Sequence, residues 1–139
     1  MPLLSQPPMD ATLQPRPLVL VVDDDARSAT LLARLLRADG YEAEVTNDGA
    51  AALARLTRNP VPNAVVTDFH LPHADGLAVG RYARSRRPAM PLFVVTGYPH
   101  SLVTAAEPLD QPLEVLTKPL DYGDLLTRLA AALGLLRGP

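Results

Sequence analysis

Four short apolar runs of this sequence each end in polar residues of the types that bind metal ions or phosphate. The residues are Asp23 and Asp24 after residues 18–22, Asp68 after residues 64–67, Thr96 after residues 92–95, and Lys118 after residues 113–117. If the apolar runs are parallel strands, their carboxyl ends meet at one edge of a sheet, which is where open α/β sheets bind ligands. We therefore expect three carboxylates, a hydroxyl and an ammonium group to lie together.

Such a group of side chains predicts phosphoryl chemistry. Three carboxylates held close together repel one another, and one of them takes up a proton unless a cation neutralises the group. Mg²⁺ (or Mn²⁺) prefers oxygen ligands and keeps open positions for phosphate oxygens. A carboxylate can attack phosphorus to form an acyl phosphate, and a lysine ammonium can neutralise charge on the transferred group. The pattern predicts a site that holds a phosphoryl group on an aspartate.

Each part of this pattern has an ordinary explanation when it is taken alone. Aspartates after a strand often sit at a helix N-terminus, where the helix dipole favours negative charge. Asp68 precedes a loop that contains proline, and aspartate is a common turn residue. Thr96 before Gly97, and Lys118 before Pro119, can be plain loop residues. The functional interpretation depends on all of these residues following successive strands.

Hydrophobic periodicity predicts alternating strands and helices. The expected strands are residues 18–22, 41–46, 64–67 (ending at Asp68), 92–95 (ending at Thr96) and 113–117. The expected helices are residues 26–39, 47–58, 75–87, a segment between 99 and 108, and 121–136. Gly40 is expected to end the first helix, either Asn47 or Asp48 to cap the second, and a leucine stripe (125, 126, 129, 133, 136) to make the last helix a core element. Five strands that alternate with five helices predict a parallel α/β sheet covered on both faces.

Composition and length limit the function classes. The chain has 139 residues, which suits one domain, and 47% of them are apolar. It has no cysteine, which excludes disulfides and thiol chemistry, and its net charge of −2 gives no reason to expect nucleic acid or membrane binding. Residues 1–16, rich in proline, are expected to form a flexible tail, and residues 17–137 the domain. No apolar run is long enough to span a membrane and no signal peptide is evident, so we expect a cytoplasmic protein.

Two further sets of polar residues are predicted to lie on the surface. Arg81, Arg84, Arg86 and Arg87 form a basic cluster on the third expected helix, for which a solvated helix face is the favoured interpretation over an anion site. His73 and His100 are expected to be surface histidines, because scattered histidines do not make a metal site.

The sequence resembles the receiver domain of bacterial two-component response regulators over about residues 17–137. The resemblance rests on four ordered stretches: Val21-Val22-Asp23-Asp24-Asp25, residues 68–76 (DFHLPHADG), Val94-Val95-Thr96-Gly97, and Thr117-Lys118-Pro119. It implies a flavodoxin-like doubly wound sheet of five parallel strands in the order 2-1-3-4-5, with five helices of which the fourth is short.

The resemblance also implies a role for each matching residue. Asp68 is the phosphoacceptor, Thr96 the switch hydroxyl, and Lys118 the contact to both Asp68 and the phosphoryl oxygens. Asp24 and Asp68 ligate Mg²⁺ together with the backbone carbonyl of His70, and Asp23 acts largely through water. The side chain of His70, with Gly97 and Tyr98, flanks the site and modulates the lifetime of the acyl phosphate. The Lys118–Pro119 peptide bond is expected to be cis.

The sequence departs from the family pattern on one face. Receivers often carry an aromatic residue three positions before the lysine, where this chain has Val115. The segment 107–112 contains two prolines, Pro108 and Pro112, which are expected to shorten the fourth helix. The site for phosphoryl chemistry is therefore expected to be intact, and the route by which the signal leaves it to be altered.

The leading hypothesis is a stand-alone receiver that takes a phosphoryl group from a sensor histidine kinase or a histidine phosphotransfer protein and then binds a downstream protein target. A receiver excised from a hybrid kinase would look similar. One alternative is a receiver-like scaffold that is not phosphorylated. Another is an aspartate-nucleophile phosphatase of the haloacid-dehalogenase type, which is disfavoured because His70 stands where those enzymes have a second aspartate. In the leading hypothesis, self-phosphorylation and slow self-dephosphorylation are the only reactions.

Overall fold

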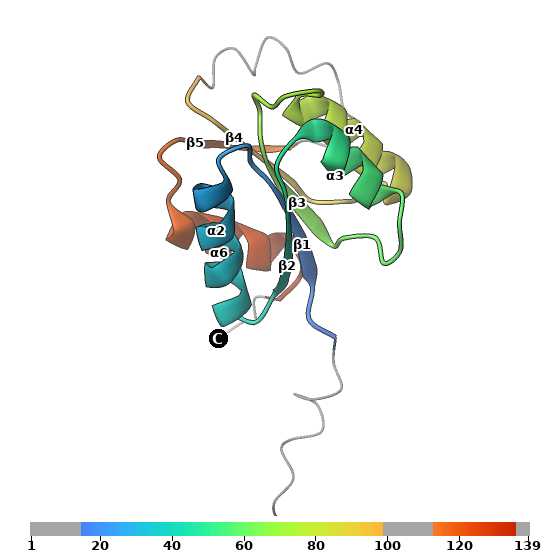
Figure 1. Cartoon of the computed structure of the whole chain (residues 1–139). Coiled ribbons are helices and arrows are strands. Elements are labelled where there is room, and N and C mark those ends of the chain that lie inside the picture. The colour runs from blue at the N-terminus through green and yellow to red at the C-terminus, as the bar shows by residue number, and fades with distance from the viewer. Residues whose placement is uncertain (1–14, 99–112, 136–139) are drawn as a thin grey trace, which may run out of the picture.

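The protein, described by a computed structural model over residues 15–98 and 113–135, is built on a five-stranded parallel sheet (Figure 1). The strands are β1 (Leu18–Val22), β2 (Glu42–Thr46), β3 (Ala64–Asp68), β4 (Leu92–Thr96) and β5 (Glu114–Thr117). Their order is β2-β1-β3-β4-β5, which confirms the order expected from the resemblance. Every residue of β1, β3 and β4 is buried, which explains why these strands are continuous apolar runs rather than alternating ones.

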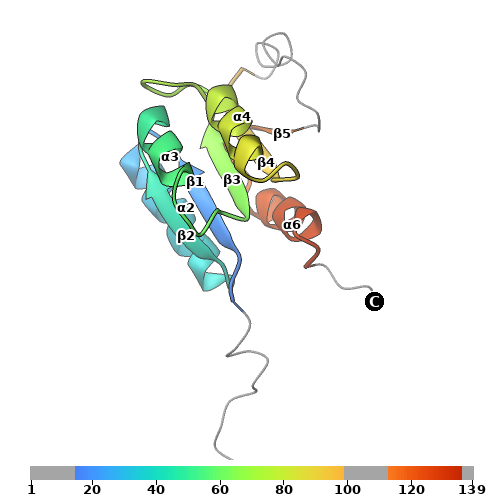
Figure 2. The ribbon, with the colours of Figure 1, turned by 90° about the vertical axis from the view of Figure 1, so that its right-hand side faces the viewer.

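Helices cover both faces of the sheet. α2 (Ala26–Ala38) and α6 (Tyr122–Ala132) lie on one face, and α3 (Gly49–Leu56) and α4 (Gly76–Arg86) lie on the other (Figure 1). Figure 2 shows α3 and α4 side by side. Side chains of β1 alternate between the two layers, so that Val19 and Val21 pack beneath α2 and α6 while Leu20 and Val22 pack beneath α3 and α4. The expected fourth helix falls in residues 99–112, outside the described residues.

An aspartate caps the N-terminus of each of the four helices in the described residues. Asp25, Asp48, Asp75 and Asp121 each accept a backbone N–H from the first turn, which satisfies amides that have no partner within the helix. At the start of α3 the cap is Asp48, whose carboxylate lies 2.7 Å from the Ala51 nitrogen. Asn47 instead donates its side-chain amide to the carbonyl oxygen of Asp23 at 2.9 Å.

Glycines in the left-handed region end α2 and α6. Gly40 has φ of 99°, and the N–H of Tyr41 donates back to Leu36, as expected for this type of helix end. Gly134 has φ of 71° and ends α6 in the same way, so the helix stops at Ala132 rather than continuing to residue 136. Within the leucine stripe, Leu125 and Leu129 are fully buried.

The basic cluster lies on the surface, as expected: Arg81, Arg86 and Arg87 are exposed and Arg84 is half-buried. Three of its arginines also make hydrogen bonds to neighbouring segments. Arg84 donates to the carbonyl oxygen of Met90, Arg86 to that of Leu56, and Arg87 to that of Val61. These bonds connect the end of α4 with the end of α3 and with the segments that enter β3 and β4. The cluster therefore contributes to positioning the sheet connections, a role that the charge pattern by itself did not predict.

Candidate functional site

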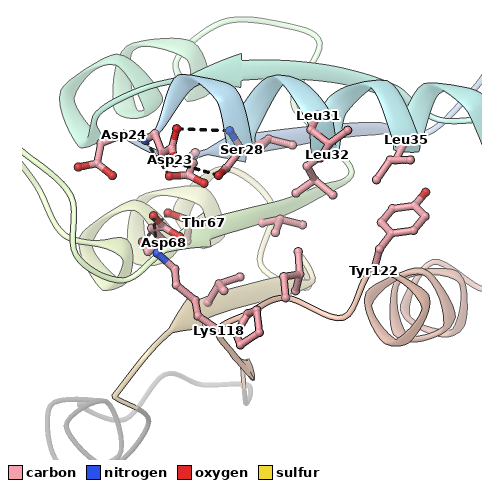
Figure 3. A pocket seen from close by; sticks show the side chains of 17 residues that line it. Asp23, Asp24, Ser28, Leu31, Leu32, Leu35, Thr67, Asp68, Lys118 and Tyr122 are labelled. Atoms are coloured by element: carbon pink, nitrogen blue, oxygen red, sulfur yellow. Dashed lines mark hydrogen bonds and ion pairs between the residues drawn. The ribbon is translucent and has the colours of Figure 1, made fainter.

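The aspartates that follow β1 and end β3 lie together at the carboxyl edge of the sheet. β1 and β3 are direct neighbours, with Val22 paired to Thr67, so Asp23 and Asp68 come next along the two strands. Carboxylate oxygens of Asp23, Asp24 and Asp68 all lie within 4.8 Å of one another (Figure 3). Asp68 is buried, Asp23 is half-buried and Asp24 is exposed, so the cluster is open to solvent on one side.

Asp25, which follows Asp23 and Asp24 in the sequence, lies outside the carboxylate cluster and caps α2. Its carboxylate caps α2 and also accepts the Ser28 hydroxyl at 3.0 Å, and these hydrogen bonds hold the pKa of Asp25 below its usual value. The Asp25 backbone N–H donates to Oδ1 of Asp23 at 2.9 Å. The loop after β1 therefore holds the Asp23 carboxylate in place by a backbone hydrogen bond.

Lys118, the residue directly after β5, reaches the site. Its Nζ lies 3.1 Å from Oδ2 of Asp68, and Figure 3 shows the two side chains pointing toward each other. Its backbone N–H donates to the carbonyl oxygen of Thr96, which anchors the loop after β5 to the end of β4. The Lys118–Pro119 peptide bond is cis.

Burial is the main influence on the charge of Asp68. Burial, followed by the hydrogen bond with Asp23 and the negative charge of Asp23, raises the pKa of Asp68 to about 7 even though Lys118 lowers it. An anionic nucleophile at this position therefore needs more positive charge than Lys118 supplies. The cluster fits a hard divalent cation, because such a cation binds carboxylate oxygens and would keep the three carboxylates ionised.

Thr96 lies at the same edge of the sheet, at the end of β4. Its side chain is buried, and the hydroxyl accepts the backbone N–H of Tyr98 at 3.0 Å. Tyr98 itself is 69% exposed and approaches the ring of His70 edge to face, with ring centroids 6.4 Å apart. His70 in turn packs against Phe69, with centroids 4.7 Å apart. His70 and Tyr98, two of the three residues expected to flank the site, thus form an aromatic row with Phe69.

Val115 stands three positions before Lys118, where receivers often carry an aromatic residue. It is half-buried on β5 and packs against a small cluster of Phe69, Leu77 and Val94. The cluster also connects β5 with the residue that follows Asp68. A valine here makes apolar contacts with the core and carries no ring.

A groove of about 460 Å³ opens beside the carboxylates and continues between α2 and the start of α6 (Figure 3). Leu31 and Leu35 of α2 line it and are both exposed. Across the groove, the hydroxyl of Tyr122 donates to Asp39 at 2.7 Å, a contact between α6 and α2 that the sequence pattern did not reveal.

Comparison with known proteins places the chain in a family. Residues 19–130 match the model of the response regulator receiver domain, so the chain belongs to that family. It is 38% identical over 116 residues to the transcriptional regulatory protein ZraR of Escherichia coli K12, covering 83% of this chain and 26% of ZraR. It is 37% identical over 116 residues to the response regulator MprA of Mycobacterium leprae, covering 83% of this chain and 50% of MprA. The chain therefore spans a quarter to a half of the length of these relatives.

A solved structure shares the fold. The response regulator receiver protein of Sinorhizobium medicae superimposes with a TM-score of 0.77 at 25% identity, over 86% of this chain and 95% of that one. No helix within residues 15–98 and 113–135 is long and apolar enough to cross a membrane.

Proposed function

We propose that this receiver domain accepts a phosphoryl group from a phosphohistidine donor onto Asp68, with Mg²⁺ or Mn²⁺, and changes its protein partners as a result. The observation that supports this most directly is a buried carboxylate at the end of a parallel sheet, 3.1 Å from one ammonium nitrogen and within 4.8 Å of an oxygen of each of two further carboxylates. A sensor histidine kinase or a histidine phosphotransfer protein is the proposed donor. We also propose that the domain works in the cytoplasm, where such donors present their phosphohistidine.

Each residue contributes a separate part of the proposed reaction. An oxygen of Asp68 attacks phosphorus as the bond from phosphorus to the histidine nitrogen breaks, and the freed nitrogen takes a proton. Asp24, Asp68 and the His70 carbonyl would hold the metal ion, with Asp23 acting largely through water; the ion supplies charge neutralisation. Lys118 contacts Asp68 and is positioned to neutralise phosphoryl oxygens. Thr96 is the hydroxyl that moves toward the phosphoryl group, since it can exchange its bond to the Tyr98 amide for a charge-assisted one.

Phosphorylation by a small donor tests the proposal. The full chain is incubated with acetyl phosphate and Mg²⁺, and its intact mass is compared with that of Asp68→Asn. We expect the wild-type protein to gain one phosphoryl group and the variant none, because an amide lacks the anionic nucleophile. No gain by the wild-type protein would instead favour a receiver-like scaffold, and steady turnover of small phosphomonoesters would favour a phosphatase. Phosphate gain by Asp68→Asn at the wild-type rate would show that the acceptor is another residue.

A further inference from the structure

Two glycines, Gly76 and Gly49, make backbone hydrogen bonds to the loop between β3 and α4 (residues 69–75). At its α4 end, the N–H of Gly76 donates to the carbonyl oxygen of Phe69 at 2.8 Å, and a Cβ on Gly76 would overlap the carbonyl oxygen of Asp68. Farther along the loop, the N–H of Gly49, at the start of α3, donates to the carbonyl oxygen of Pro72 at 3.0 Å. The loop therefore has one backbone contact to its own helix and one to a different helix.

Gly49 lies so close to this loop that it has no room for a side chain. A Cβ built on Gly49 would lie 2.5 Å from Cβ of Ala74 and 2.8 Å from its carbonyl carbon, and it would overlap the Ala74 carbonyl oxygen. Most of these contacts are with backbone atoms, which cannot rotate away as the end of a long side chain can. A methyl group at position 49 therefore displaces the loop, the start of α3, or both.

The conformation of the loop also requires support from its surroundings. His73 has φ of 72°, a left-handed conformation that costs a residue with a side chain about 1 kcal/mol or more and persists where neighbouring structure holds it. The bond from Gly49 to Pro72 acts on the residue directly before His73. The contact with Ala74 acts on the residue directly after it. The start of α3 thus borders the strained residue on both sides.

We infer that Gly49 is a positioning residue for the metal site: by lacking a Cβ, it lets the start of α3 fix the loop that presents the backbone carbonyl of His70. The inference rests on the proposed function, in which that carbonyl is one of the metal ligands. Asp23 and Asp24 lie on a different loop and Asp68 lies within β3, so a displacement confined to the 69–75 loop moves one ligand and not the carboxylates. The α3 layer thereby contributes to a site that none of its side chains lines.

The test measures Mg²⁺ binding to the full chain by calorimetry. Gly49→Ala is expected to weaken the affinity about tenfold, in the range found when groups that orient metal ligands are removed. Asp48→Ala is the control for a weakened α3, because it removes the helix cap without adding an atom toward Ala74. Gly123→Ala is the control for the substitution itself, since its Cβ would meet only Oδ1 of Asp121 at 3.4 Å. Both controls are expected to bind Mg²⁺ within about twofold of the wild-type protein, because neither adds an atom toward the loop.

Two outcomes separate this inference from the proposed function. If the wild-type protein and Gly49→Ala bind Mg²⁺ equally well, or if Asp48→Ala loses as much affinity as Gly49→Ala, the positioning role is wrong and the metal site stands. If the wild-type protein binds no Mg²⁺, the proposed site is wrong and the inference falls with it.

A measurement on the wild-type protein decides the case if Gly49→Ala does not fold. Saturating Mg²⁺ should slow hydrogen exchange of the Gly49 amide, which is bonded to Pro72, more than that of the Gly40 amide, which is bonded to Arg37 at the far end of α2. Equal slowing at both amides, or none at Gly49 while Mg²⁺ is bound, would overturn the inference.

Discussion

The ammonium nitrogen of Lys118 lies 3.1 Å from Oδ2 of Asp68, although 50 positions separate the two residues in the chain. The pair is asymmetric, because the Lys118 side chain is 49% exposed and the Asp68 side chain 6%. An exposed lysine contributes little to stability through such a contact, since water competes for it. Lys118 instead acts on the buried carboxylate of Asp68: it lowers the pKa of Asp68, although burial raises that pKa by more.

Lys118→Ala should therefore impair phosphorylation far more than folding. We expect the rate of Asp68 phosphorylation by acetyl phosphate to fall about 100-fold, as when one charge-stabilising donor is removed from an active site. The melting temperature should change little, because the side chain is half exposed. Intact mass followed over time measures the rate. Lys118→Arg keeps the positive charge and should recover part of the phosphorylation rate. Equal rates for the wild-type protein, Lys118→Ala and Lys118→Arg would show that the ammonium is not used.

Asp24→Ala should remove most of the stabilisation that Mg²⁺ provides. A cation with millimolar affinity raises the unfolding free energy by only about 1–2 kcal/mol at about ten to twenty millimolar. Differential scanning fluorimetry with and without Mg²⁺ measures the effect. Asp39→Ala is the matched control, because Asp39 bonds to Tyr122 and takes no part in the carboxylate cluster. A rise in melting temperature that is undiminished in Asp24→Ala would place the metal ion elsewhere.

The metal-free protein should lose stability as the pH rises from about 4 to about 7. The pKa of Asp68 is raised from 3.8 to about 7 in the folded state, so within this window the folded protein binds a proton that the unfolded chain has released. The unfolding free energy then falls with increasing pH, by at most about 1.4 kcal/mol per unit from this group. Below about pH 4, Asp68 is protonated in both the folded and the unfolded protein, and this contribution to the unfolding free energy is fully present.

Asp68→Asn isolates this contribution, because the amide does not titrate. The melting temperature of the wild-type protein in chelator should fall relative to that of Asp68→Asn as the pH rises through the window. Saturating Mg²⁺ should reduce the difference, since the cation stabilises the ionised carboxylate. A constant difference between the two proteins from pH 4 to pH 8 would contradict the raised pKa of Asp68.

Thr96→Val should separate a structural role of the hydroxyl from a role in signalling. The substitution keeps the shape of the side chain and removes the acceptor for the Tyr98 amide, so we expect a loss of about 1 kcal/mol in unfolding free energy by urea titration. Phosphorylation of Asp68 should continue. In the wild-type protein, binding of beryllofluoride, a phosphoryl mimic, should change the hydrogen exchange of the Tyr98 amide. This change should disappear in Thr96→Val. The same change in the variant as in the wild-type protein would show that Thr96 does not move.

The elements of the described residues could be predicted from sequence because their signals are local. Continuous apolar runs identify the central strands, and Gly40 identifies the end of α2, since such signals act on neighbouring amides and carbonyls. The same kind of signal was available at Gly134, but the leucines that continue beyond it suggested a longer last helix. The polar residues after successive strands were enough to predict which side chains share one edge of the sheet.

Tertiary structure alone decided the distances and environments within that edge. The raised pKa of Asp68 depends on how deeply β3 is buried and on Asp23 from the neighbouring strand. The close approach of Gly49 to Ala74 joins two layers of the fold that no local pattern connects. Leu31, an apolar residue of α2, is 58% exposed on the groove, which the sequence pattern does not indicate. Periodicity describes which face of an element is apolar, whereas burial, pKa and close packing depend on what another element places against that face.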